Sequence, residues 1–239
     1  MTIRVRRNAY EMTEMTPTNT KAPATRPKPR VVHVVFDTNI AFTNSPTELV
    51  NAELGSFISD HRSHADLKIA WYLAAIVHLE RQHQMEPRAL ELLVHVRKLE
   101  KLLGHNLNIP DDLVRQRVAE VIAKQQKELG IISLELRHEA VNWDGLIRDA
   151  AFRRAPFSPG EKEKGFRDAL VIESLLQLLP TVPVADRVVV VSNDGLVQDA
   201  AKARTEAHKN VQVLSSLSEL RGVINALVSQ VDEDFIRLW

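Results

Sequence analysis

Short apolar runs alternate with longer periodic stretches from residue 31 onward. The run Val-Val-His-Val-Val-Phe at 31–36 is rich in β-branched residues, which is typical of a strand buried on both faces. Further strands are expected at 67–70, 131–136, 187–191 and 211–214. The stretches between them favour helices, the clearest at 168–179 and 196–209, with another that follows residue 70 and continues through Glu80. This alternation predicts an α/β protein in which helices cover both faces of a central parallel sheet of about five strands.

The segment 86–129 has apolar positions at helical spacing with many charges between them, and it predicts a helical hairpin. Asn106, Asn108 and Pro110 mark its turn. Asp111 or Asp112 is expected to cap the second helix and to complement its dipole. We expect a helical insertion that packs on the helices of the sheet rather than a separate domain.

Residues 1–30 differ from the rest of the chain in composition and charge. They hold seven basic and two acidic side chains, a balance of +5, which leaves −5 for the remainder because the whole chain is neutral. The stretch is rich in Thr, Pro and Arg and lacks apolar periodicity, so we expect a disordered basic tail ahead of one domain at 31–239. A transit peptide is the competing interpretation, although no clear amphipathic helix is present.

Composition narrows the chemistry that the chain can perform. Cysteine is absent, so disulfides, thiolate metal sites and cysteine nucleophiles are excluded, and any metal needs oxygen or histidine ligands. No apolar run is long enough for a membrane span, so we expect a soluble, cytoplasmic protein with no membrane partner. Zero net charge argues at first against nucleic acid, yet an acidic body can handle a polyanion if its carboxylates hold metal ions.

Four acids are the candidate functional residues. Asp37 directly follows the first strand, Asp194 follows the fourth, Asp168 starts the helix before the fourth, and Glu80 lies on the early helix. Each alone is explained as well by a helix cap or a solvated surface position. Functional groups gather at the carboxyl ends of parallel strands, and carboxylates that converge there repel one another unless they hold a divalent cation. Oxygen ligands select Mg²⁺ or Mn²⁺ over zinc.

The segments around these acids resemble PIN domains. Val-Val-Phe-Asp37-Thr-Asn-Ile is similar to the first strand and first acid of that family, and Ala-Ile-Val-His-Leu-Glu80 to its second acidic position. Gly-Phe-Arg-Asp168-Ala-Leu-Val resembles the third, and Val-Val-Ser-Asn-Asp194-Gly-Leu the fourth. The motifs keep the family's order between residues 31 and 220. The stretch from Pro156 is similar to that of a branch of stand-alone bacterial PIN-like proteins.

The resemblance implies a PIN-like three-layer α/β/α fold and a metal-dependent endoribonuclease that hydrolyses single-stranded RNA. Asp37, Glu80, Asp168 and Asp194 would be its catalytic residues and its Mg²⁺ or Mn²⁺ ligands. Thr38, Asn39, Ser192 and Asn193 would support them. An antitoxin-like or regulatory protein and a homodimer are the partners it allows. The hairpin is longer than in small toxin-type members, which weakens any transfer of their substrate preference.

Several nearby residues are assigned secondary roles. Lys162, Lys164 and Arg167 precede Asp168 and are candidates for gripping phosphate, with Arg153 and Arg154 as weaker ones and solvated surface charge as the alternative. Asp199 could share the role of Asp194. His33 is expected to be a hydrogen-bonded core histidine, and Phe157 and Phe166 are expected to pack their loop onto the body.

Other functions fit the sequence less well. Phosphotransfer domains of the haloacid dehalogenase type also place an aspartate after a first strand, but they need a second aspartate where this chain has Asn39. A structure-specific DNA nuclease lacks support, because no helix-hairpin-helix glycine pattern is present. A PIN-like module that binds RNA or a partner without catalysis remains the main alternative.

Overall fold

The computed structural model describes residues 30–64, 67–159 and 164–237, and the predicted tail at 1–30 lies outside them except for Arg30. Its strands are β1 Arg30–Phe36, β2 Leu67–Ala74, β3 Ile131–Leu134, β4 Arg187–Val191 and β5 Val211–Leu214. Its helices are α1 Thr38–Ala41, α2 Ala52–Asp60, α3 Ala75–Leu103, α4 Asp111–Leu129, α5 Trp143–Ala151, α6 Phe166–Leu178, α7 Gly195–Thr205 and α8 Leu217–Arg237. Two 3₁₀ turns lie at His138–Ala140 and Leu179–Thr181.

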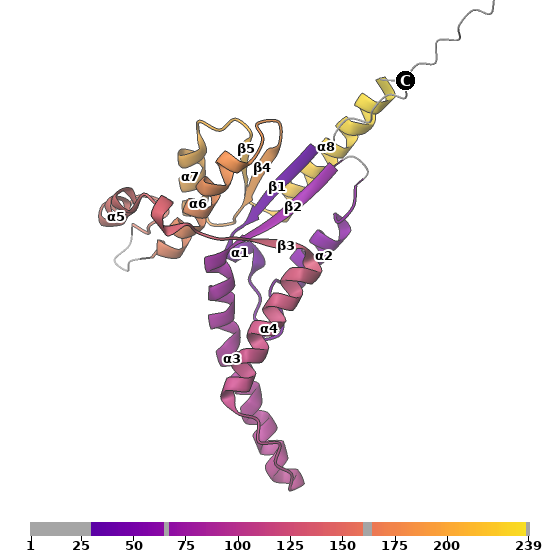
Figure 1. Ribbon diagram of the computed structural model, residues 1–239, viewed down its shortest axis with the longest axis vertical. Helices are drawn as coiled ribbons and strands as arrows, with labels where there is room; N and C mark the ends of the chain where they lie inside the picture. Colours follow the sequence, from indigo (N-terminus) through magenta and orange to yellow (C-terminus); the bar gives the residue numbers. More distant parts are fainter. Residues whose placement is uncertain (1–29, 65–66, 160–163, 238–239) are drawn as a thin grey trace, which may run out of the picture.

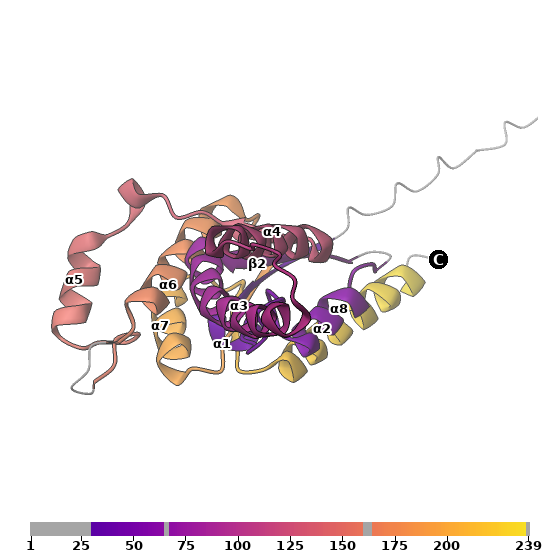
Figure 2. The ribbon, with the colours of Figure 1, turned by 90° about the horizontal axis from the view of Figure 1, so that it is seen from below.

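All five strands are parallel and lie in the order β3-β2-β1-β4-β5, so the predicted sheet is confirmed (Figure 1). The valines of β4 alternate between its faces. Val189 and Val191 join a core with α2 and α8, whereas Val188 and Val190 join a second core with α6 and α7. Figure 2 shows these two helix pairs on opposite sides of the sheet. The fold is the expected three-layer α/β/α arrangement.

The second strand is longer than the sequence pattern suggested. Residues 71–74 were expected to start a helix, but Trp71 to Leu73 pair with Val34 to Phe36 of β1, and the same segment pairs with β3 on its other side. Trp71 and Leu73 face the first core and Tyr72 faces the second. A short run that is apolar on both sides has no periodicity to separate helix from strand, which explains the error.

The helical hairpin is present, and its first arm continues the helix that carries Glu80. α3 runs for 29 residues from Ala75, with Pro87 inside it, and ends at Gly104 in the left-handed conformation. Figure 1 shows α3 and α4 leaving the sheet together. The α4 N-cap is Pro110, so neither Asp111 nor Asp112 caps it, although both lie in its first turn and complement its dipole. No helix of the described ranges is long and apolar enough to cross a membrane.

Candidate active site at the carboxyl edge of the sheet

Asp37 is fixed where the two central strands end. Its backbone nitrogen donates to Val191 at the end of β4 (3.0 Å), which continues the pairing of β1 with β4. Its side chain caps α1, accepting from the Thr38 nitrogen at Oδ1 (2.7 Å) and from Ser192 Oγ at Oδ2 (2.7 Å). Only 1% of Asp37 is exposed. Burial raises the pKa of its carboxyl above the ordinary 3.8, against the lowering effect of these hydrogen bonds.

Ser192 connects Asp37 to Asp194. Its hydroxyl is buried, donates to Asp37 and accepts from the Asp194 backbone nitrogen (3.1 Å). Asp194 then caps α7, because its Oδ1 accepts from the nitrogens of Leu196 (2.8 Å) and Val197 (3.4 Å). The loop after β4 therefore places the second aspartate beside the first.

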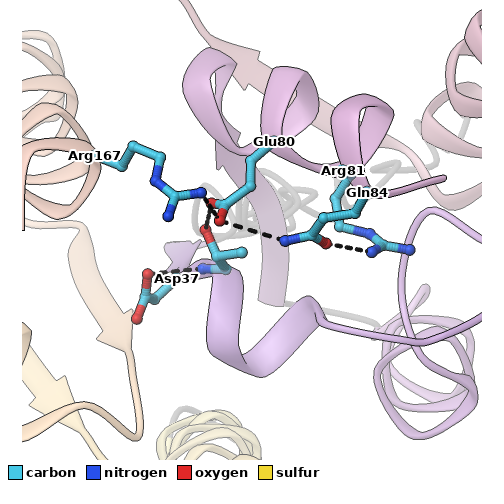
Figure 3. A network of polar contacts seen from close by, with 6 residues as sticks. Asp37, Glu80, Arg81, Gln84 and Arg167 are labelled. Atoms are coloured by element: carbon cyan, nitrogen blue, oxygen red, sulfur yellow. Dashed lines mark hydrogen bonds and ion pairs between the residues drawn. The ribbon is translucent and has the colours of Figure 1, made fainter. Parts of the chain in front are cut away.

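Glu80 reaches the same edge from α3. Its Oε2 accepts from Thr38 Oγ1 (3.0 Å), and its Oε1 pairs with the guanidinium of Arg167 on α6 (Figure 3). Gln84, one turn further along α3, donates weakly to Oε1 (3.3 Å). Glu80 thus joins the helix of the hairpin, the loop after β1 and the start of α6.

Asp168 lies in the first turn of α6, next to Arg167. Burial, together with the charges of Asp37, Asp194 and Glu80, raises its pKa to about 6, against the lowering effect of the Arg167 guanidinium. The sequence had placed the start of this helix at Asp168 itself, whereas the structure begins it two residues earlier.

The four acids therefore share one electrostatic neighbourhood. Among the residues that the structure describes, no three His, Cys, Asp or Glu side chains are arranged as a formed metal site. Their oxygens instead face protein partners, since Arg167 and Thr38 hold Glu80 and backbone nitrogens hold Asp37 and Asp194. The donor set still fits a hard divalent cation, because all four groups are carboxylates. Burial and the neighbouring carboxylates raise the pKa values of Asp37 and Asp168, as expected where negative charges lie close together without a balancing cation.

The predicted supporting residues divide into two groups. Thr38 and Ser192 bond Glu80 and Asp37 as described, and Asn39 Nδ2 donates to Asp37 Oδ2 (3.3 Å). Asn193 is exposed, and the described contacts include no hydrogen bond from it to the four acids. Asp199 is exposed on α7 and does not influence the pKa of Asp37 or Asp168.

The basic residues predicted to bind phosphate differ in their surroundings. Arg167 pairs with Glu80. Lys164, three residues before Arg167, is exposed, and Lys162 lies outside the described residues. Arg153 and Arg154 are exposed after α5.

Two predictions about apolar and aromatic neighbours need correction. Phe157 is buried as expected, but Phe166, the first residue of α6, is 50% exposed. His33 bonds the Tyr72 hydroxyl through Nδ1 (3.0 Å), while its buried Nε2 lies 3.8 Å from Asp186 Oδ2 and makes no hydrogen bond to any residue that the structure describes. The expectation of a fully bonded core histidine is therefore only half met.

Sequence reasoning missed the residues that anchor Glu80 to the loop after α1. Gln84 Oε1 accepts from Arg81 Nη1 (2.6 Å) (Figure 3). This fully buried guanidinium also donates to the carbonyls of Leu49 (3.0 Å) and Glu48 (2.8 Å). The spacing of Gln84 four positions after Glu80 was a usable signal, because such residues share a helix face. Nothing in the sequence pointed to Arg81.

Comparison with known proteins agrees with this arrangement. A family model described as a PIN domain matches residues 34–196, which is more than half of the chain and includes all four acids. The searches of curated proteins and of solved structures gave no match. PIN domains are generally nucleases that use divalent metal ions. On its sequence match and its five-stranded α/β/α architecture, the chain belongs to the PIN domain family.

Proposed function

We propose that the protein is a metal-dependent endoribonuclease that hydrolyses phosphodiester bonds in single-stranded RNA. One observation carries the proposal. Four carboxylates from β1, α3, α6 and the β4–α7 loop meet at one edge of the sheet, where their combined charge and burial raise the pKa of Asp168 to about 6. Keeping so much unbalanced negative charge together costs stability, and it is expected where a function needs it.

Asp37, Glu80, Asp168 and Asp194 would hold Mg²⁺ or Mn²⁺. Such an ion supplies a water of lowered pKa and charge neutralisation on the phosphate. Asp37 is the most rigid of the four, because Ser192 and the Thr38 nitrogen fix both of its oxygens. Ser192 also ties the position of Asp37 to that of Asp194.

Arg167 and Lys164 would meet the phosphate backbone. Arg167 pairs with Glu80 in the structure, and its exposed guanidinium lies within reach of solvent. A cation held by the acids would balance the negative charge of Glu80 and weaken its pairing with Arg167. The guanidinium would then be available to a phosphate oxygen. Lys164 lies three residues earlier, outside the acidic edge.

The test is cleavage of a labelled single-stranded RNA by the purified chain in Mn²⁺, in Mg²⁺ and in EDTA. We expect cleavage only with metal, and we expect Asp37→Asn to abolish it. Because burial raises the pKa of Asp37, its negative charge is less favourable in the folded protein than in the unfolded chain, so the metal-free variant should melt no lower than wild type. Mn²⁺ should raise the melting temperature of wild type but not of the variant.

Asp112→Asn is the matched control, since this acid lies at the hairpin turn with its side chain 92% exposed. It should leave cleavage and the Mn²⁺ response unchanged. A wild-type protein that binds RNA but neither cleaves it nor responds to Mn²⁺ would favour a non-catalytic RNA-binding module. The Arg167–Glu80 pair favours that second function, because an arginine already occupies one oxygen of a predicted metal ligand.

A further inference from the structure

A pocket of about 480 Å³ lies between α5 and the start of α6. Its walls are mainly apolar and include Leu146, Ile147, Ala150, Phe157 and Phe166. Arg153 and Lys164 also line it. Small-molecule sites in proteins have this size and this combination of apolar walls with a few polar groups.

The pocket has a rigid wall on the side of the loop before α6. Phe157 is buried in a small core with Leu146 of α5 and Ala169 of α6, so the two helices are joined beneath the pocket. The Ser158 nitrogen donates to the Lys164 carbonyl (3.0 Å), which joins the described segments that end at residue 159 and begin at residue 164. Gly165 has a φ of +112°, and a Cβ there would lie 2.4 Å from the Pro156 carbonyl oxygen. Only glycine permits this close approach of the two loop segments.

Three consecutive residues connect the pocket to the acids. Phe166 lines the pocket, Arg167 pairs with Glu80, and Asp168 is influenced by Asp37 and Asp194. Successive residues on a helix point about 100° apart, so the first turn of α6 presents one face to the pocket and another to the acids. A ligand in the pocket would therefore be adjacent to whatever the acids hold.

The exposed side chains around the pocket suit a nucleotide. Phe166 is 50% exposed and Ile147 is 62% exposed, which offers an aromatic face and an apolar wall to a planar ring. Neither Arg153 nor Lys164 takes part in a salt bridge among the described residues. Stacking of bases on aromatic rings with cations along the backbone is the usual way in which proteins hold single-stranded nucleic acid.

We propose that this pocket binds one unpaired nucleobase of the nucleic-acid chain whose backbone passes the four acids. The inference rests on the proposed function, and it adds a specificity element. A base must leave a duplex to enter the pocket, so the pocket selects single strands. Arg153 and Lys164 hold the phosphates on either side of the bound base.

The test measures binding of a fluorescently labelled single-stranded RNA by anisotropy, in EDTA and in Ca²⁺, with Phe166→Ala and Phe152→Ala. Phe152 is the matched control, because its ring is 69% exposed at the end of α5 but does not line the pocket. Phe166→Ala should weaken binding about 5- to 100-fold, the usual effect of losing one base stack, and Phe166→Tyr should restore it. Phe152→Ala should change the affinity less than twofold.

A second arm replaces each nucleotide of the RNA in turn by an abasic one. At one position of the RNA, the abasic nucleotide should weaken binding to the wild-type protein by the same factor as Phe166→Ala does. The same abasic RNA should bind the Phe166→Ala variant no more weakly than the intact RNA does. Equal effects of Phe166→Ala and Phe152→Ala, or additive losses from the abasic position, would overturn the proposal. So would absence of RNA binding by wild type.

Cleavage measured in parallel separates this inference from the proposed function. If wild type cleaves RNA and Asp37→Asn does not, while Phe166→Ala binds normally, the pocket proposal is wrong and the nuclease stands. If binding depends on Phe166 but no metal supports cleavage, the pocket stands and the nuclease is wrong. A duplex of the same sequence should bind more weakly than the single strand, with a difference that Phe166→Ala removes.

Discussion

Asp37 and Asp194 each have two roles at the level of the single side chain. One oxygen of each caps a helix, and the same carboxylates contribute to the charge that raises the pKa of Asp168. A cap and a functional acid are often treated as rival explanations for an aspartate that follows a strand. Here the cap fixes the rotamer of the acid, so the structural role serves the site.

The pKa of Asp168 leads to a prediction about stability and pH. Its value of about 6 lies above the ordinary 3.8, so the folded protein takes up this proton before the unfolded chain does as the pH falls. Ionised Asp168 therefore lowers stability above pH 6, and the penalty disappears as the pH falls toward 4. We expect Asp168→Asn to raise the melting temperature in EDTA at pH 7.5, and its advantage over wild type to shrink by pH 4.5.

Comparison of the variant with wild type removes the contribution of other titrating groups, such as the buried histidines. Asp144→Asn, at an exposed position in the first turn of α5, provides the control. An advantage of Asp168→Asn that stayed constant from pH 7.5 to 4.5 would contradict the raised pKa.

The location of the four acids at one edge of the sheet could be predicted from the sequence, because the fold class brings strand ends and the helices beside them to that edge. Their hydrogen-bond partners could not be found in this way. Arg81 contacts Glu48 and Leu49, and Arg167 contacts Glu80, through three-dimensional packing of segments far apart in the chain. Helix spacing predicts neighbours on one element but not across elements.

At the level of elements, both arms of the hairpin hold the loop that follows α1. From α3, Arg81 donates to the carbonyls of Glu48 and Leu49. From α4, Gln125 donates to the Thr47 carbonyl (2.7 Å) and accepts from the Leu49 nitrogen (2.6 Å). This loop leads back to α1, whose cap is Asp37, so the base of the hairpin braces the site.

Gln125→Ala should therefore destabilise the protein, because it leaves one backbone donor and one backbone acceptor of the loop without their partner. We expect a loss of about 1 to 3 kcal/mol in the free energy of unfolding, measured by urea titration. Gln116→Ala on the same helix is the control, since Gln116 bonds only the exposed Glu120, and it should cost less than about 0.5 kcal/mol. Equal losses in the two variants would show that the brace is unimportant.

The end of β2 shows why some element bounds can be predicted from the sequence and others cannot. Residues 67–74 form one strand, yet the apolar run continues without a break into α3, so the sequence could not mark where the strand ends. The valine strand β4 was found with its bounds, because charged and polar residues stand on both sides of it.

At the level of the whole molecule, the outer half of the hairpin is an appendage. Its hydrogen bonds and salt bridges in the described structure stay within the hairpin, such as the bond from Arg97 to Asp111 (2.7 Å). Leu102 is 80% exposed and Leu107 63% exposed, and the hairpin contributes to the core only through residues nearer the sheet, such as Val118.

Replacing residues 97–115 with a short glycine-containing turn should leave the fold intact. We expect the free energy of unfolding to change by less than about 1 kcal/mol, because few contacts between this segment and the body are lost. Circular dichroism and urea titration would measure it. A shortened protein that fails to fold would show that the outer half supports the body.

The central position of β1 in the sheet determines when the site can form during synthesis of the chain. β1, the first of the described strands in the sequence, can pair with β4 only after β4 has been synthesised, and the hydrogen bond from Ser192 to Asp37 joins residues 155 positions apart. At ordinary rates of synthesis this interval lasts roughly 8 to 30 s. Until then one edge of β1 has no strand paired with it, and Asp37 has neither β4 nor Ser192 beside it. A growing chain therefore cannot assemble its acidic edge before β4 has been synthesised. During that interval the chain is still bound to the ribosome and its messenger RNA.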